Sequence, residues 1–217
     1  MGFNKITIDS VDHKIGYIGG GAYLENIADW PMDNNKRPMF PFISLEKKFF
    51  PTNAFPDHMM ITVFLPLPKK NIFSINYFRD ISLNLNIDNI DIKKLSAKVL
   101  IHRKGTNELI IPNEFALPKG FINLKSLSSD ELKEEIEDEI NGIEISKQFG
   151  RPAWLQDQIN INSRYHFITQ INETDLKNFN KAYENIFNDG MGYIFLDYKI
   201  KNTNKTSNAG FFFIQYL

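Results

Sequence analysis

Four polar residues of the C-terminal half could form a site, because they lie in or beside apolar stretches of the sequence. They are Gln156, His166, Gln170 and Asp189. A buried amide that finds no hydrogen-bond partner costs about 1–3 kcal/mol, so the two glutamines must be paired if they are buried. Most side-chain hydrogen bonds go to backbone or water, which favours a structural role for both. The alternative is a polar pocket shared by all four residues.

The other reactive residue types form no catalytic or metal-binding motif. The chain has no cysteine, which excludes disulfides, thiolate nucleophiles and cysteine-ligated metals. Its four histidines lack the spacing of metal ligands. The glycines at 19–21 precede no Gly-Lys-Ser/Thr, and there is no Gly-x-Ser-x-Gly motif. We therefore predict no catalytic residue, no metal and no cofactor, and we favour a binding protein over an enzyme.

An acidic helix is predicted over residues 128–140. Ser128 and Glu131 match a capping box, and Gly142 follows the end of the helix. A narrow apolar stripe at i, i+4 and i+8 should dock this helix on the body of the protein. The carboxylates of the opposite face would then attract a basic partner. The candidate partner-binding residues are Glu131, Glu134, Glu135, Asp138 and Glu139.

Composition and charge narrow the class of protein. The 217 residues are 42% hydrophobic, which is enough for a sizeable core. A net charge of −1 argues against nucleic-acid binding driven by phosphate neutralisation. The sequence shows no secretory signal and no apolar run of about 20 residues, so we expect a soluble, cytoplasmic protein without a membrane partner.

Several strands can be predicted from apolar runs and alternation. Residues 72–78 and 81–87 alternate between apolar and polar types, which is typical of half-buried strands. Residues 104–107 lie between two further apolar runs and predict a hairpin turn. The apolar C-terminal segment, residues 209–217, predicts a buried strand in which Phe211, Phe213 and Tyr216 are covered. A second helix is predicted over about 175–186.

Three motifs of the first half recur in the second half at offsets of about 126–131 residues, judged from the sequence alone. Residues 20–24 match 150–155, residues 39–46 match 165–172, and residues 60–65 match 191–196. We expect a duplicated unit whose strand pairs superpose. The predicted architecture is one domain, residues 1–217, with internal repeats at about 17–127 and 145–217.

At these motifs the chain resembles the YwqG-like family, a bacterial domain of uncharacterised activity. The resemblance includes Gly20-Gly21, Trp30-Pro31, the segment 150–156 and Thr169-Gln170-Ile171. Two positions depart from the family pattern, because Ser44 stands where Gln is usual and Asn188 where Gly is usual. The resemblance implies an α+β fold that is rich in β-structure, with two tandem structural repeats and few helices. Some relatives lie near contact-dependent toxin loci, so it also implies an immunity role as one function to test.

Two functional hypotheses follow. The first is a non-catalytic protein-binding module, in particular a cytosolic immunity protein that neutralises a basic bacterial toxin. The second is a small-ligand-binding protein or enzyme with a pocket between the repeats, near Gln156, Gln170 and Asp189. The sequence leaves the identity of the partner and the oligomeric state open.

Overall fold

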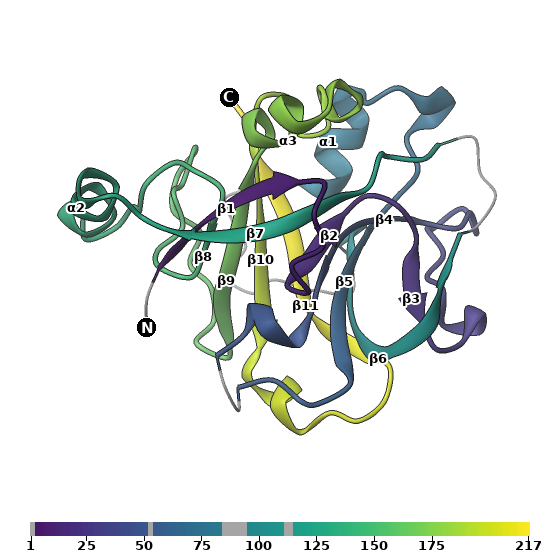
Figure 1. Ribbon diagram of the computed structural model, residues 1–217. Coiled ribbons are helices and arrows are strands. Elements are labelled where there is room, and N and C mark those ends of the chain that lie inside the picture. Colours follow the sequence, from purple (N-terminus) through teal and green to yellow (C-terminus); the bar gives the residue numbers. More distant parts are fainter. Residues whose placement is uncertain (1–2, 52–53, 84–94, 111–114) are drawn as a thin grey trace.

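Antiparallel strands close into a single barrel (Figure 1). The computed structural model describes residues 3–51, 54–83, 95–110 and 115–217. Within these ranges the ring order is β11-β10-β9-β8-β1-β7-β2-β4-β5-β6, and β6 closes the ring by pairing with β11. β3 (Ala22–Leu24) lies outside the ring and pairs with the far end of β6. The barrel strands are β1 (Asn4–Asp9), β2 (Gly16–Ile18), β4 (Phe40–Leu45), β5 (Met59–Leu65), β6 (Lys98–Leu109), β7 (Gly120–Ser126), β8 (Lys147–Gln148), β9 (Tyr165–Asn172), β10 (Met191–Asp197) and β11 (Ser207–Gln215).

The predicted α+β fold with two tandem repeats is wrong. The α-helices of the described residues are three short segments, α1 (Ile75–Ile81), α2 (Ser129–Glu137) and α3 (Glu173–Phe179). Segments 17–127 and 145–217 do not form separate units, because β1 pairs with both β7 and β8, and β6 pairs with β11. One hydrogen-bonded ladder therefore runs through both segments. In the described ranges, no helix combines the length and apolar character needed to cross a membrane.

Two strand pairs of the barrel nevertheless share the same register. Ser44 lies opposite Thr62 in β4–β5, and Gln170 lies opposite Tyr193 in β9–β10. Each pair is interrupted by a register shift at the corresponding position of β4 and β9. The sequence motifs thus mark equivalent strand pairs inside one barrel.

By their place in the ring, the strands that flank these pairs are also equivalent, β2 to β8 and β7 to β1. Along the chain, however, β7 comes after β2, whereas β1 comes before β8. β2 is followed in the ring by β7, and β8 is followed by β1. We call β7, β2, β4, β5 and β6 the first half of the barrel, and β1, β8, β9, β10 and β11 the second half. The N-terminal strand β1 therefore completes the half that is otherwise built from C-terminal residues.

The core has one inner and two outer apolar clusters. Inside the barrel, Phe42 packs against Phe187 with ring centroids 5.3 Å apart. Outside the second half, Trp154 covers Tyr193 and its neighbours on β10 and β11. Outside the first half, Trp30 packs on Phe64 of β5. Each half thus carries a covering segment that makes a second apolar layer.

The predicted C-terminal strand is confirmed, except that it ends at Gln215 and so excludes Tyr216. β11 pairs with β10 along six registered positions and with β6 on its other side. Phe211 and Phe213 are fully buried in the outer cluster of the second half, and Tyr216 is partly buried.

The second predicted helix, 175–186, is shorter than expected, because α3 ends at Phe179 and a 3-10 helix follows at Lys181–Tyr183. Two further local predictions are wrong. The alternating segment 72–78 contains the start of α1, whose N-cap is Ser74 and whose residues Tyr77, Phe78 and Ile81 are buried. Most of the predicted strand 81–87 lies outside the described residues. Residues 104–107 form no turn, because β6 runs straight through them. Gly105 is extended there, and a Cβ would lie 2.5 Å from the Leu24 carbonyl oxygen of β3.

Candidate functional site

Gln170 is buried and fully paired with backbone. Its Nε2 donates to the carbonyl oxygens of Ile143 at 3.0 Å and Ile145 at 2.9 Å, and its Oε1 accepts from the Ala153 N–H at 2.8 Å. The amide therefore fastens the loops at 143–145 and 153 to the outside of β9. Both polar atoms of the amide are thus hydrogen-bonded to backbone, as predicted for a glutamine with a structural role.

Two neighbouring strands add polar groups that fasten the same loop. The Tyr193 hydroxyl donates to the Ala153 carbonyl at 2.5 Å. Gln215 Oε1 accepts from the backbone N–H groups of Leu155 at 3.0 Å and Gln156 at 3.3 Å. Three adjacent strands thus hold the segment that carries Trp154 over the outer cluster. Gln215 was not among the predicted site residues, although its polar amide stands out within the apolar C-terminal run.

The equivalent positions of the first half hold a different polar chain. Ser44 Oγ lies 2.9 Å from Thr62 Oγ1, which lies 2.9 Å from His102 Nε2. His102 Nδ1 lies 2.8 Å from the Arg103 carbonyl oxygen, so it donates there and Nε2 accepts from Thr62. Burial lowers the pKa of His102 to about 4, which keeps the ring neutral. All three side chains are inaccessible to solvent, which gives this chain a structural role.

The structure does not bring the four predicted pocket residues together. Gln156 is exposed and donates to the Tyr216 carbonyl at 2.7 Å. His166 is also exposed and lies on the wall of a separate apolar hollow. The exposed Asp189 has φ 54, and its carboxylate lies 3.5 Å from Lys177 Nζ. Gln156, His166 and Asp189 therefore each have different neighbours, and none of these neighbours is shared with the Gln170 side chain.

The acidic helix is attached through one of its carboxylates. Glu135 and Lys147 form an ion pair in which both side chains are buried. The Glu135 carboxylate also accepts from the backbone N–H groups of Ile143 and Arg151, each at 2.8 Å. Burial lowers the pKa of Lys147, and the contact with Glu135 partly offsets that effect. Glu135 therefore anchors α2 and cannot meet a partner from outside.

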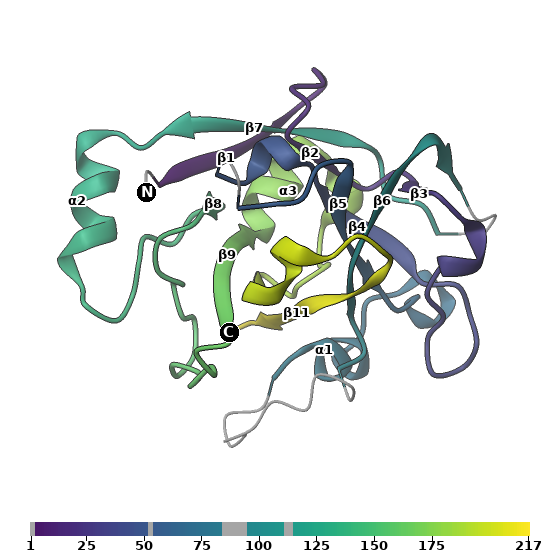
Figure 2. The same cartoon turned by 90° about the horizontal axis from the view of Figure 1, so that it is seen from below.

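The capping box is confirmed, but the apolar stripe faces the opposite way from the prediction. Ser128 and Glu131 make both reciprocal bonds, and Glu131 also pairs with Lys5 at 2.7 Å. The side chains expected to dock on the body are exposed at 44%, 60% and 53%; they are Leu132, Ile136 and Ile140. α2 projects from the barrel in both views (Figures 1 and 2).

The outer surface of α2 and the turn after it thus combines two chemistries. The stripe Leu132, Ile136 and Ile140 is apolar, and around it stand exposed carboxylates. These are Asp130, Glu134, Glu137, Asp138 and Glu139. We call this combination the α2 surface.

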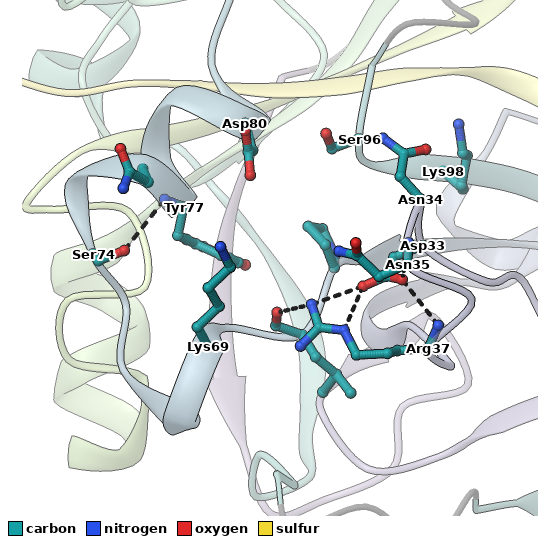
Figure 3. A pocket seen from close by; sticks show the side chains of 13 residues that line it. Asp33, Asn34, Asn35, Arg37, Lys69, Ser74, Tyr77, Asp80, Ser96 and Lys98 are labelled. Carbon is teal, nitrogen blue, oxygen red and sulfur yellow. Dashed lines mark hydrogen bonds and ion pairs between the residues drawn. The ribbon is translucent and has the colours of Figure 1, made fainter.

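A polar hollow of about 150 Å³ lies beside α1 (Figure 3). The Arg37 guanidinium on its wall is already engaged by the Asp33 carboxylate, at 2.9 Å, and by the Leu67 carbonyl, at 3.0 Å. The Tyr77 hydroxyl is buried without a hydrogen-bond partner among the described residues, and burial raises its pKa. Lys98 Nζ donates to the Leu95 carbonyl at 3.0 Å. The space is large enough for a few water molecules that hydrogen-bond to these polar groups.

An apolar hollow of about 750 Å³ lies where β9 begins and β10 ends. Its walls also include the turn at 149–151 and the 3-10 helix at Tyr198–Asn202. The apolar lining includes Phe3, Phe50, Phe149, Phe167, Leu196 and Ile200. Its polar side chains include Arg151, His166, Asp197 and Lys201. This volume falls in the range of small-molecule sites.

Comparison with known proteins does not assign the chain to a family. No family model matches the chain, and no curated protein matches it.

Proposed function

We propose that this protein is a non-catalytic binding module whose α2 surface contacts a basic partner protein. The observation that carries the proposal is the exposure of an apolar stripe amid carboxylates on a projecting helix. An apolar stripe on an amphipathic helix normally faces the body of the protein, so its exposure here supports a role in contacting a partner.

The attachment of α2 supports this role. A helix of nine residues is marginal in water by itself, so its position depends on tertiary contacts. The buried Glu135–Lys147 pair and the Glu131–Lys5 pair fix α2 from the barrel side. The opposite side is thereby presented in one orientation, which lowers the entropy cost of binding.

The chemistry of the surface defines its partner. Exposed carboxylates attract cationic surfaces and raise association rates, whereas buried apolar contacts determine how long a complex lasts. A basic surface with its own apolar residues meets both requirements. The YwqG-like resemblance suggests a more specific role, in which the partner is a bacterial toxin that this protein neutralises in the cytoplasm.

Association kinetics test the proposal, with a partner first captured from the native host and purified. We expect Glu134→Gln/Asp138→Asn/Glu139→Gln to slow association by about tenfold at low salt, and by less at high salt. Ile136→Ser should instead speed dissociation, because it removes an apolar contact. Glu135 is left unchanged in these variants, because it is buried.

A matched control separates local from global charge. Glu25→Gln/Asp157→Asn/Glu184→Gln removes three exposed carboxylates elsewhere. It should retain most of the wild-type association rate. If both triple variants slow association equally, or neither does, α2 is not the contact surface.

A further inference from the structure

We propose that the apolar hollow is a binding site for a small amphiphile, an elongated apolar molecule that ends in a carboxylate. This site is separate from the α2 surface and does not depend on the partner proposed above. Three observations lead to it: the lining of the hollow, the fate of the equivalent place in the other half, and the charges at the rim.

The lining sets the chemistry of the ligand's body. Aromatic side chains from separate parts of the chain converge on the hollow, among them Phe3, Phe50 and Phe149. Leu196 and Ile200 add aliphatic surface from β10 and the segment after it. Apolar surface left in water is unfavourable, so burial of this lining by an apolar ligand favours binding.

The first half shows what fills the equivalent place. By strand register and turn geometry, His166 and Gly150 of the hollow correspond to Phe40 and Gly20. There a gap of only about 20 Å³ remains, lined in addition by Phe115 and Leu117. Phe115 packs edge-on against Phe40, with centroids 4.9 Å apart. In the first half, apolar side chains of the protein itself fill the space, whereas in the second half the described residues leave the space open.

The rim sets the chemistry of the ligand's head. Among the described lining residues the one carboxylate is Asp197, which accepts from Arg164 Nε at 2.7 Å and from the Lys199 backbone N–H at 2.9 Å. The rim also carries the cationic side chains of Arg151 and Lys201. Its net charge is therefore positive, although the whole chain carries −1. The Arg151 guanidinium donates to the Glu135 backbone carbonyl, which leaves its charge uncompensated, and an anionic head group complements this rim through charge-assisted hydrogen bonds.

Calorimetric titration tests the site, with dodecanoate as the probe at concentrations below micelle formation. We expect one dodecanoate per chain, and at least about tenfold weaker binding of dodecyltrimethylammonium, which has the same tail and the opposite charge. Ala54→Trp places a large side chain at the wall and should weaken dodecanoate binding at least about tenfold.

Charge variants on the rim give a second, independent measurement. Lys201→Glu should weaken dodecanoate binding by about three- to tenfold, while Lys205→Glu, the same change at an exposed residue outside the lining, should not. Thermal melts confirm that each variant is folded; if Ala54→Trp does not fold, the Lys201 and Lys205 pair decides. Absence of binding to the wild type, equal binding of both head groups, or wild-type affinity in Lys201→Glu would overturn the proposal.

Discussion

At the scale of single residues, the polar groups of the strands form two equivalent sets with different chemistry. Gln170, Tyr193 and Gln215 hold the covering loop of the second half, whereas Ser44, Thr62 and His102 bond one another in the first half. The Ser44 hydroxyl thus bonds Thr62 of the neighbouring strand, whereas the Gln170 amide at the equivalent position bonds a covering loop.

His102 makes stability depend on pH. Its folded pKa is about 4 and the ordinary value is 6.5, so between these values the unfolded state binds more protons. The free energy of unfolding therefore rises with pH across this window, and about 3 kcal/mol is lost as pH falls through it. The variant His102→Gln places at residue 102 the amide that Gln215 has at the equivalent position of the other half. In urea unfolding, this variant should lose less free energy of unfolding than the wild type between pH 6.5 and pH 4. An unchanged slope in His102→Gln would contradict the assignment.

Residue-level prediction from sequence succeeded where local rules apply. The buried amide of Gln170 had to be paired, and backbone groups pair it. The buried state of Glu135 could not be foreseen, because its partner Lys147 lies beyond the helix and only the fold brings the two together. A carboxylate in an acidic run looks like its exposed neighbours until its partner is known.

At the scale of elements, α2 depends on the Glu135–Lys147 pair. Lys147→Met leaves the Glu135 carboxylate buried without its cation, which should cost about 3–5 kcal/mol of unfolding free energy. The double variant Lys147→Met/Glu135→Gln should lose less than the sum of the two single changes, because no unpaired charge remains. Lys5→Met breaks the more exposed pair with Glu131 and should cost no more than about 1 kcal/mol. Urea unfolding gives these values; similar losses in Lys5→Met and Lys147→Met would show that the buried pair is no special anchor.

Elements were predictable where one local signal dominates. The capping box identified α2, and the continuous apolar run identified β11. The α1 segment was predicted as a strand because Phe73, Ile75 and Tyr77 alternate with other residues, but Ser74 caps a helix that buries Tyr77, Phe78 and Ile81. Gly105 suggested a turn, but it serves the close approach of β3 to a continuous β6. In both cases tertiary contacts overrode the local pattern.

At the scale of the whole molecule, the sequence motifs located equivalent strands but not their assembly. Equal spacing of motifs is compatible with two separate units or with two halves of one barrel. The pairings that decide between them, β1 with β8 and β6 with β11, join residues more than 100 positions apart. No local pattern encodes such pairings, so the closed ring emerged only from the structure.

Because β1 belongs to the second half but also pairs with β7 of the first half, we predict that both halves unfold together. Ile6 of β1 is buried in the inner cluster, and its N–H donates to the Ser146 carbonyl at 2.8 Å. Ile6→Ala should therefore destabilise the barrel by about 2–5 kcal/mol. The two tryptophans report on the halves separately, since Trp30 covers the first half and Trp154 the second.

Urea unfolding followed by fluorescence, in Trp30→Phe and Trp154→Phe backgrounds, measures each half through the tryptophan that remains. With Ile6→Ala added, both transitions should shift by the same free energy relative to their parents, because a closed ladder cannot lose one half and retain the other. Val11→Ala, at an exposed position after β1, should change either transition by no more than about 0.5 kcal/mol. Tandem units would behave differently: the Trp154 signal would be lost at lower urea while the Trp30 signal kept its parental midpoint. That separation would refute the closed barrel as the cooperative unit of this protein.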